Sequence, residues 1–327
     1  MTDATAVPAE ITGPTPMGRL RWAVRKVGIV VPFLILFIIL TIVSPSFLRF
    51  QNLTNILDQQ SGIIIVAAAG TLVLIAGGID LSVGALYGLA GATAAQLAVS
   101  FGPASGILAA LGVGLAVGLA NGVIVTRFRI NPLIGTLAMS FVVSGIGAIA
   151  TQGNLVVVLD HPEFQTFAAT KFFGITSAAW MMIVLAAAGA ILMSRTTFGR
   201  YVYATGGNAE AARLGGVRIN TVRVATYALS GMAAALAGTI DASRTLSAQA
   251  SAGSFLTFTV LTGIIVGGTS ILGGEGSVQR TVVGCLFVAL VANGFNLLGL
   301  DPFYQQVTLG IILLLAVGTD AWSRRHD

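Results

Sequence analysis

Long apolar runs separated by short polar stretches make up most of the chain. A basic cluster at residues 19–26 precedes an uncharged run from Val27 to Leu48. Further runs without charge follow at 59–79, 81–126, 130–159, 172–194, 224–240, 245–274, 281–300 and 302–319. A membrane-spanning helix needs about 20 apolar residues. The run 81–126 is long enough for two spans, with a Gly- and Pro-containing hinge at 101–106, so the pattern predicts about ten spans.

These spans are predicted to be helices, because lipid satisfies no backbone polar group and the alternation of barrel strands is absent. The first apolar run is too long for a signal peptide and lacks a small-residue cleavage site, so we expect a retained helix. The spacing of Gly114, Gly118 and Gly122 predicts that a neighbouring helix approaches closely. Residues 1–18 are expected to form a disordered cytoplasmic tail, and residues 19–327 a single membrane domain.

Composition agrees with an all-α, polytopic membrane protein. Hydrophobic residues make up 55% of the chain, charged residues 9%, and the mean hydropathy is +0.91, which excludes a soluble domain. The net charge of +5 does not indicate a nucleic-acid partner, because the position of basic residues matters more in a membrane chain. With ten spans, fourteen of the 17 Lys and Arg residues fall on one side and three on the other. The positive-inside rule therefore places both termini in the cytoplasm.

An internal repeat is visible when the chain is compared with itself. The stretch AGGIDLS at 76–82 returns as AGTIDAS at 237–243. In the ten-span topology the two copies end their helices on opposite sides of the membrane. Helices 2–5 and 7–10 are thereby predicted to be inverted repeats, an architecture of transporters in which the path lies between the halves. Chance similarity between two apolar stretches rich in Ala and Gly is the alternative.

The acids inside this repeat are Asp80 and Asp241. A proton-coupled carrier would place ionisable groups in mid-span, whereas both acids fall at predicted segment ends. Their oxygens are therefore expected to accept free N–H groups at the start of the next helix. Together with Gly77, Gly78 and Ser82 they form a predicted structural hinge. A proton or ligand site at Asp80 is the alternative.

Several kinds of chemistry are missing from the sequence. No Gly-Lys pair is present, so no Walker A loop exists to bind nucleotide phosphates. The two histidines, His161 and His326, lie in a loop and near the end of the chain, so neither a zinc pair nor a catalytic triad is predicted. We therefore expect no catalytic residue, no metal site and no cofactor bound by this chain alone.

The predicted cytoplasmic loop 195–223 carries the clearest local signal. Within residues 206–217, Asn208 is suited to cap a short helix and the pair Gly215-Gly216 to end it. A short, rigid, exposed helix with few charges fits a groove on a partner protein. A helix lying on the membrane surface and held there by arginines is the alternative.

Four strings in chain order resemble the ribose and simple-sugar permeases of bacterial ATP-binding-cassette (ABC) importers. They are Gly77–Gly84, Asn131–Leu137, Thr197–Val217 and Gly267–Gly276, and the similarity runs from about Asn52 to Trp322. The resemblance implies ten-helix subunits with the type II fold of the vitamin B12 importer, paired as a homodimer or heterodimer in the bacterial inner membrane. It also implies cytosolic ATPase subunits that bind ATP and Mg²⁺, and an extracytoplasmic sugar-binding protein.

The same resemblance implies that the short loop helix is a coupling helix that enters the ATPase, with Asn208, Glu210, Ala211, Ala212, Arg213 and Leu214 as its contact residues. It further implies that segments 5 and 10 line a path at the dimer interface. Thr136, Ser140 and Ser144 fall on one face of segment 5, and Thr308 in segment 10 is expected to face them. Ordinary packing between helices is the alternative for these four. We expect alternating access for a monosaccharide whose identity the sequence leaves open.

Two other classes of function are compatible with parts of the pattern. An ion- or proton-coupled secondary transporter of a small polar solute explains the inverted repeat but gives the capped loop helix no purpose. A non-transporting scaffold or an intramembrane enzyme is disfavoured by the lack of catalytic residues. Co-purification of a peripheral ATPase separates these classes from an ABC permease.

Overall fold

A computed structural model describes the backbone of residues 28–324 and the side chains of residues 28–318. The expected disordered tail, residues 1–18, lies outside the described residues. The described helices are α2 (Val30–Val43), α3 (Phe50–Ile75), α4 (Val83–Phe101), α5 (Pro103–Arg127), α6 (Pro132–Thr151), α7 (Thr166–Ala169), α8 (Ser177–Arg195), α9 (Thr197–Gly207), α10 (Ala209–Leu214), α11 (Ile219–Thr245), α12 (Leu256–Val266), α13 (Val278–Leu297) and α14 (Pro302–Arg324).

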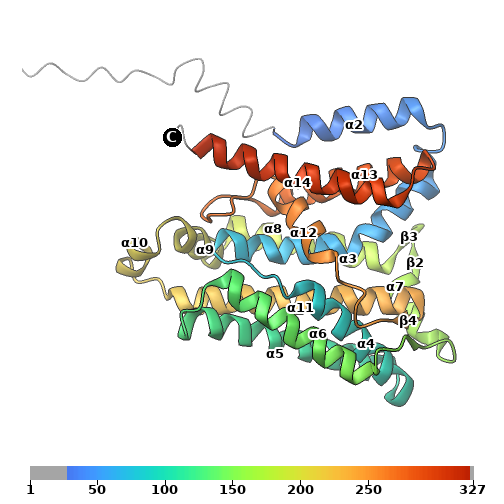
Figure 1. Cartoon of the computed structure of the whole chain (residues 1–327), viewed down its shortest axis with the longest axis horizontal. Helices are drawn as coiled ribbons and strands as arrows, with labels where there is room; N and C mark the ends of the chain where they lie inside the picture. The colour runs from blue at the N-terminus through green and yellow to red at the C-terminus, as the bar shows by residue number, and fades with distance from the viewer. Residues whose placement is uncertain (1–27, 325–327) are drawn as a thin grey trace, which may run out of the picture.

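The long helices lie side by side in one bundle, with α10 projecting from one end (Figure 1). Six of the described helices, α3, α4, α5, α6, α8 and α13, are long and apolar enough to cross a membrane. Shorter apolar helices accompany them at Val30–Val43, Leu256–Val266 and Pro302–Gly318. The mostly α-helical, multi-pass membrane architecture expected from the sequence is therefore confirmed.

The end of the bundle opposite α10 carries the short connecting elements. A 3-10 turn (Pro162–Gln165) precedes α7, and strands β2 (Lys171–Phe172) and β3 (Ile175–Thr176) form a hairpin. Strand β1 (Val156–Val157) pairs antiparallel with β4 (Ser247–Ala248). This pair ties the connection after α6 to the connection after α11.

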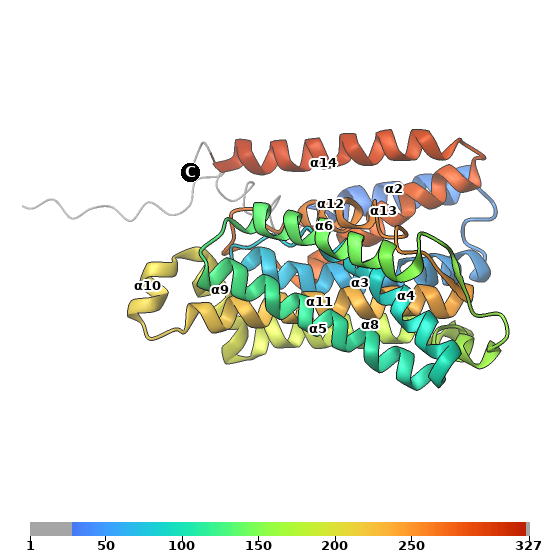
Figure 2. The same ribbon diagram turned by 60° about the horizontal axis from the view of Figure 1, so that its bottom comes forward.

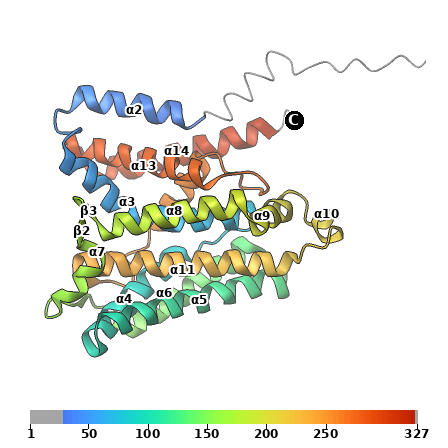
Figure 3. The same ribbon diagram turned by 180° about the vertical axis from the view of Figure 1, so that it is seen from behind.

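Two helices begin inside the bundle after a non-helical segment. Residues 76–82 lead from the end of α3 to the start of α4, and residues 246–255 lead from the end of α11 to the start of α12. Because α3 and α11 run in opposite directions (Figures 1 and 3), the two segments enter the bundle from opposite ends. They meet where Gly84 and Gly253 pack backbone against backbone, and where the Gly84 N–H donates to Thr257 Oγ1 over 3.0 Å.

This arrangement corrects two expectations from the sequence. Residues 237–243 lie inside α11 and not at a helix break, and the non-helical segment after α11 is 246–255. The charge-free run 245–274 is not one span either, because it contains only the 11-residue α12 between two non-helical stretches. Both stretches are rich in Ser and Gly, which favour turns over helix, and the absence of charge concealed this change of structure.

Asp241 also differs from its expected role as a hinge cap. It lies in α11, four residues before the helix ends at Thr245. Its Oδ1 accepts a hydrogen bond from Arg244 Nη2 over 2.7 Å, and Arg244 Nη1 donates to the backbone carbonyl of Asp58 in α3. The acid therefore belongs to an ion cluster that joins α11 to α3 near the strand-bearing end of the bundle.

Helix α11 occupies the centre of the bundle, packed against α3, α4 and α5. A Cβ at Gly114 would meet the Gly231 carbonyl at 2.6 Å, and a Cβ at Gly122 would meet the Val224 Cα at 2.7 Å. Gly118 lies equally close to the backbone of α11. The predicted close approach to this glycine face is confirmed, and α11 is the helix that makes it.

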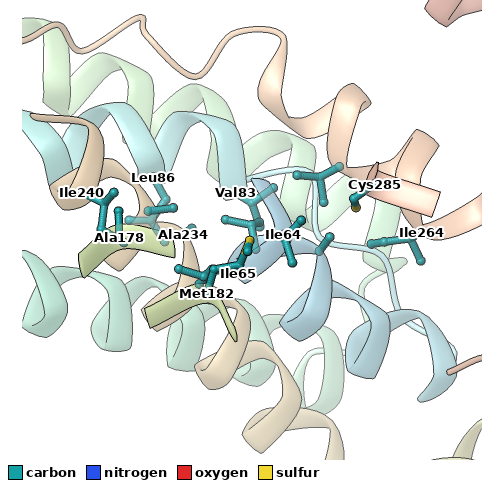
Figure 4. Close-up of a cluster of buried hydrophobic side chains, with 14 of the residues drawn as sticks. Ile64, Ile65, Val83, Leu86, Ala178, Met182, Ala234, Ile240, Ile264 and Cys285 are labelled. Carbon is teal, nitrogen blue, oxygen red and sulfur yellow. The ribbon is translucent and has the colours of Figure 1, made fainter. Parts of the chain in front are cut away.

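Large apolar side chains fill the space around α3, α8 and α11. Ile64 and Ile65 of α3 lie among Val83 and Leu86 of α4 and Met182 of α8, together with further residues of α11, α12 and α13 (Figure 4). On one side of the bundle, α14 packs over α12 and α13 (Figure 2). The core therefore holds the starts of both interrupted helices against the full-length helices around them.

Candidate functional site

The segment 76–82 is fixed by a buried cluster around Asp80, whose exposed fraction is 5%. Oδ1 of Asp80 accepts the Ser82 N–H at 3.0 Å and the Ser82 hydroxyl at 2.7 Å, and Oδ2 accepts the Ser230 hydroxyl of α11 at 2.8 Å. Asn121 of α5 donates to Ser82 Oγ at 2.8 Å. Removing a buried acceptor of this kind leaves several donors unpaired, which costs far more than the net value of one hydrogen bond.

Two further side chains hold the backbone of the same segment. Thr136 at the start of α6 accepts the Leu81 N–H at 3.0 Å, and its own hydroxyl lies 2.8 Å from the Pro132 carbonyl. Tyr227 of α11 donates to the Ile79 carbonyl over 3.1 Å. The segment is therefore pinned to α5, α6 and α11 at once.

Gly77 and Gly78 of this segment are glycines for two different physical reasons. Gly77 has a positive φ of 78°, a conformation that a side chain disfavours. A Cβ at Gly78 would lie 2.6 Å from the Tyr227 hydroxyl. The structure thus brings Gly77, Gly78, Asp80 and Ser82 together in residues 76–82, which are called the support below. Asp241 lies elsewhere.

A cavity of about 460 Å³ lies beside this support. It is bounded by the start of α4, one face of α6 and the segment that leads into α12. Asn131 caps α6 by accepting the Leu133 N–H at 2.9 Å, and Pro132 occupies the first turn, where its missing N–H costs nothing. The lining residues are Leu81, Gly84, Ala85, Leu137, Ser140, Ser144, Ala148, Thr151, Gly153, Gln249, Ala250, Ser251, Ser254, Thr257 and Phe258.

Of the four residues expected on the path, two line the cavity and two do not. Ser140 and Ser144 line it from α6. Thr136 is fully buried beneath it and bonded to the support, and the Thr308 hydroxyl donates to the Tyr304 carbonyl of its own helix over 2.8 Å. Thr308 is not among the cavity's lining residues. The i, i+4 spacing therefore places Ser140 and Ser144 on one cavity-lining face of α6, whereas Thr308 does not face them across this cavity, and their role in a path stays a prediction.

Sequence reasoning missed the other polar wall of the cavity, which the residues before and within the first turn of α12 provide. Gln249, Ser251, Ser254 and Thr257 all line the cavity, together with the ring of Phe258. Their signal was the polar stretch from Ser247 to Ser254 inside an otherwise apolar run. A second, smaller cavity of about 210 Å³ also includes Gln249, along with Tyr87 and Asp241, so Gln249 borders both spaces.

Helix α10 has the capped form that its sequence predicts. Asn208 Oδ1 accepts the Ala211 N–H at 2.9 Å, and the helix ends at Leu214, followed by Gly215 as its C-cap and Gly216 with φ of 84°. Arg213 and Glu210 form an exposed ion pair of 2.6 Å. The hydrogen bond from Arg213 to Glu210 raises the pKa of that guanidinium further above its usual value. The helix thus shows neutralised charges and one apolar side chain, Leu214, that is 80% exposed.

A junction of close-packed glycines lies directly behind α10. Gly206 packs against the Ile75 carbonyl at the end of α3, and that carbonyl accepts the Gly274 N–H over 2.9 Å. Gly273 contacts Gly77, and Arg223 Nε donates to the Ala76 carbonyl over 3.3 Å. Backbone contacts therefore connect Gly206, just before α10, to the first residues of the segment 76–82.

Comparison with known proteins identifies the family. The family model described as branched-chain amino acid transport system / permease component matches residues 52–317. The chain belongs to this family of transport permeases.

Within the part of the chain that the structure describes, no group of His, Cys, Asp and Glu side chains is suited to hold a metal ion.

The permease is similar over nearly its whole length to sugar permeases. It is 36% identical to the ribose import permease protein RbsC of Escherichia coli over 303 residues, which cover 91% of this chain and 94% of the relative. It is 35% identical to the L-arabinose ABC transporter permease protein AraH of Azospirillum brasilense, over 99% and 94% of the two chains. The fructose import permease protein FrcC of Rhizobium meliloti is 33% identical, over 87% and 81%. No solved structure matches the permease.

Proposed function

We propose that this permease is the transmembrane subunit of an ATP-driven, binding-protein-dependent importer that carries a monosaccharide across the bacterial inner membrane. The observation that carries the proposal is α10, a capped helix with a paired charge and an exposed Leu214, projecting from the bundle on a glycine junction. A membrane subunit that worked alone would have no use for such a helix. The names of the ribose, arabinose and fructose relatives support the substrate class.

The proposed fold is the ten-helix, type II fold of the vitamin B12 importer. Its spans are α2, α3, α4, α5, α6, α8, α11, α12, α13 and α14, and α3–α6 form an inverted repeat with α11–α14. The opposite directions of α3 and α11 and the meeting of their two non-helical segments at Gly84 and Gly253 support this pairing. Interrupted helices that meet between inverted repeats are a common feature of transporters.

In this proposal α10 enters a groove on a cytosolic ABC ATPase, which binds ATP and Mg²⁺, while the permease itself binds no cofactor. The contact surface is formed by Asn208, Glu210, Ala211, Arg213 and Leu214, and the buried Ala212 anchors the helix to its own subunit. The loop 195–223 and both termini then lie in the cytoplasm. The opposite end of the bundle, with β2, β3 and α7, receives an extracytoplasmic sugar-binding protein.

Transport follows by alternating access in a dimer with a second permease subunit, either another copy or a related chain. When the ATPase subunits close on ATP, they move α10, and the glycine junction passes this movement to residues 75–77 and 273–274. The segment 76–82 is bonded to α6 through Thr136, so α6 and its cavity face move with it. We propose that the sugar path runs along that face, where Ser140 and Ser144 line the cavity.

The experiment that tests this function is purification of the detergent-solubilised permease together with a candidate ABC ATPase and a candidate sugar-binding protein from the same organism. We expect a stable complex whose ATPase activity rises when loaded binding protein is added. The double variant Glu210→Arg/Arg213→Glu keeps the ion pair but inverts the charges that the ATPase meets, and it should lose this stimulation. Full stimulation of that variant would contradict the role of α10. A permease that transports alone on an ion gradient would instead be a secondary transporter.

A further inference from the structure

Most hydroxyl groups on the helices of this permease are used by the helices themselves. Thr41, Thr93, Thr126 and Thr239 donate to a carbonyl four residues earlier, as does Thr151 at the end of α6. This is the usual way for a hydroxyl to be satisfied where no water is present. A hydroxyl inside the bundle that does not bond in this way is therefore exceptional.

Four polar side chains without a hydrogen-bond partner among the described residues line the cavity of about 460 Å³, whereas Thr205 and Thr269, whose buried hydroxyls also have no partner there, are not among its lining residues. Among the described residues, the side chains of Ser140, Ser144, Gln249 and Ser251 make no hydrogen bond to another protein group. Ser140 and Ser144 come from α6, whereas Gln249 and Ser251 come from the segment before α12. Two walls that lie far apart in the sequence thus present free donors and acceptors to the same space.

The remaining features of the cavity define the class of molecule that fits it. None of the lining residues is charged, so an ionic ligand would find no counter-ion there. The Phe258 ring is 57% exposed and lines the cavity, where it offers an apolar face beside the polar groups. The volume is within the range of pockets that hold small molecules, about 300–1,000 Å³.

We propose that this cavity is a monosaccharide-binding subsite within the permease. The axial C–H groups of the sugar ring lie on Phe258, and its hydroxyls exchange hydrogen bonds with Ser140, Ser144, Gln249 and Ser251. A sugar has both an apolar ring face and a rim of neutral donors and acceptors, which is the combination that the cavity offers. The inference rests on the proposed function only for the delivery of the sugar, because the binding chemistry is within this chain.

Protection of single cysteines from a thiol reagent tests the subsite. Ser144→Cys and Ser251→Cys place a thiol on opposite walls, and the natural Cys285 is buried and gives the background. The transporter complex carrying either variant is reconstituted in liposomes and treated with a small water-soluble methanethiosulfonate. D-ribose, L-arabinose and D-fructose are each added at high millimolar concentration. We expect at least one of the three to slow labelling of both cysteines, whereas urea at the same concentration should not.

Matched variants connect the protection to the proposed contacts. Ser100→Cys, an exposed serine at the far end of α4, should be labelled at the same rate with and without sugar. Phe258→Ala should raise the sugar concentration needed for protection about tenfold, the loss expected when one aromatic contact is removed. Phe258→Tyr keeps the ring and should retain protection.

Two results would overturn the subsite. One is labelling of both cavity cysteines that none of the three sugars changes, and the other is protection that Phe258→Ala and Phe258→Tyr affect equally. Binding-protein-stimulated ATPase activity, measured on the same preparations, separates this failure from failure of the proposed function. Intact stimulation with no protection removes the subsite and leaves the ATP-driven importer in place. Cysteines that the reagent does not reach at all also count against an open sugar site.

Discussion

The two non-helical segments, 76–82 and 246–255, each precede a helix that begins inside the bundle, but their polar side chains are used in opposite ways. In the first, Asp80 is buried and its oxygens accept hydrogen bonds from Ser82 and Ser230. In the second, the side chains of Gln249 and Ser251 line a cavity and make no hydrogen bond to another group of the described residues. A segment whose polar groups are all engaged is a support, whereas one with free polar groups is suited to hold a ligand.

In the proposed mechanism, the segment 76–82 transmits movement, and the segment 246–255 binds the sugar and is called the binding segment below. The support contacts the glycine junction behind α10 at one end and Thr136 of α6 at the other. The binding segment has no such link to α10 but faces α6 across the cavity. In the proposed mechanism, energy from the ATPase therefore reaches the cavity through the segment 76–82, and the sugar is held between α6 and the segment 246–255.

The largest effect is expected from breaking the support. Asp80→Ala leaves the buried Ser82 N–H and the hydroxyls of Ser82 and Ser230 without their acceptor, which should lower the free energy of unfolding by about 3 kcal/mol. Thermal unfolding of the detergent-solubilised permease measures it. Ser251→Ala in the binding segment and the exposed Asp160→Ala are the controls, and neither should change stability by more than about 0.5 kcal/mol. Equal stability of Asp80→Ala and Ser251→Ala would remove the distinction between the segments.

The next effect concerns the glycine junction. A Cβ at Gly206 would overlap the Ile75 carbonyl, so Gly206→Ala should cost about 2 kcal/mol of stability through overpacking and should uncouple ATPase activity from transport. Gly207→Ala is a close control, because a Cβ at Gly207 meets no atom within 4 Å. Uptake and ATPase activity are measured together for both variants. A Gly207→Ala defect as large as that of Gly206→Ala would show that the junction is not the transmitting contact.

A change at the tip of α10 should affect coupling and not the fold. Leu214 is 80% exposed, so Leu214→Glu should leave the unfolding temperature of the isolated permease unchanged. In the complex it introduces a charge into an apolar contact, and stimulated ATPase activity should fall about tenfold, or about 1.4 kcal/mol. Retention of full stimulation would show that α10 does not enter the partner's groove.

The smallest effect is expected when single hydroxyl groups of the predicted path, those of Ser144 and Thr308, are removed. Ser144→Ala removes a free hydroxyl from the cavity and should reduce uptake about threefold, in keeping with the loss of one hydrogen bond. Thr308→Ala removes a hydroxyl that its own helix uses and should leave uptake unchanged. Initial uptake rates in cells that contain equal amounts of each variant provide the test. A larger loss for Thr308→Ala would place the path along α14.

The sequence predicts those parts of the fold that depend on local chemistry. Asn208 and the Gly215-Gly216 pair define α10 by capping alone, and the glycines of α5 reveal the close approach of another helix. The i, i+4 spacing of Ser140 and Ser144 finds one wall of the cavity.

Features that depend on long-range packing were not visible in the same way. The charge-free run 245–274 hides an interrupted helix, because neutral Ser, Gly and Gln residues are as compatible with a span as with a binding segment. The sequence similarity between 76–82 and 237–243 predicts a second helix break at the wrong place, because residues 237–243 continue α11. Asp241 was expected at a hinge, and its pairing with Arg244 within α11 became visible only in three dimensions.

In the proposed mechanism, the permease moves a monosaccharide with energy that enters through α10. The most direct measurement is uptake of radiolabelled D-ribose, L-arabinose and D-fructose into liposomes that contain the permease, its ATPase and loaded binding protein. We predict uptake of at least one sugar that requires ATP and is lost with Leu214→Glu. Uptake by the permease without the ATPase, driven by an ion gradient and insensitive to Leu214→Glu, would show that α10 does not deliver the energy for transport.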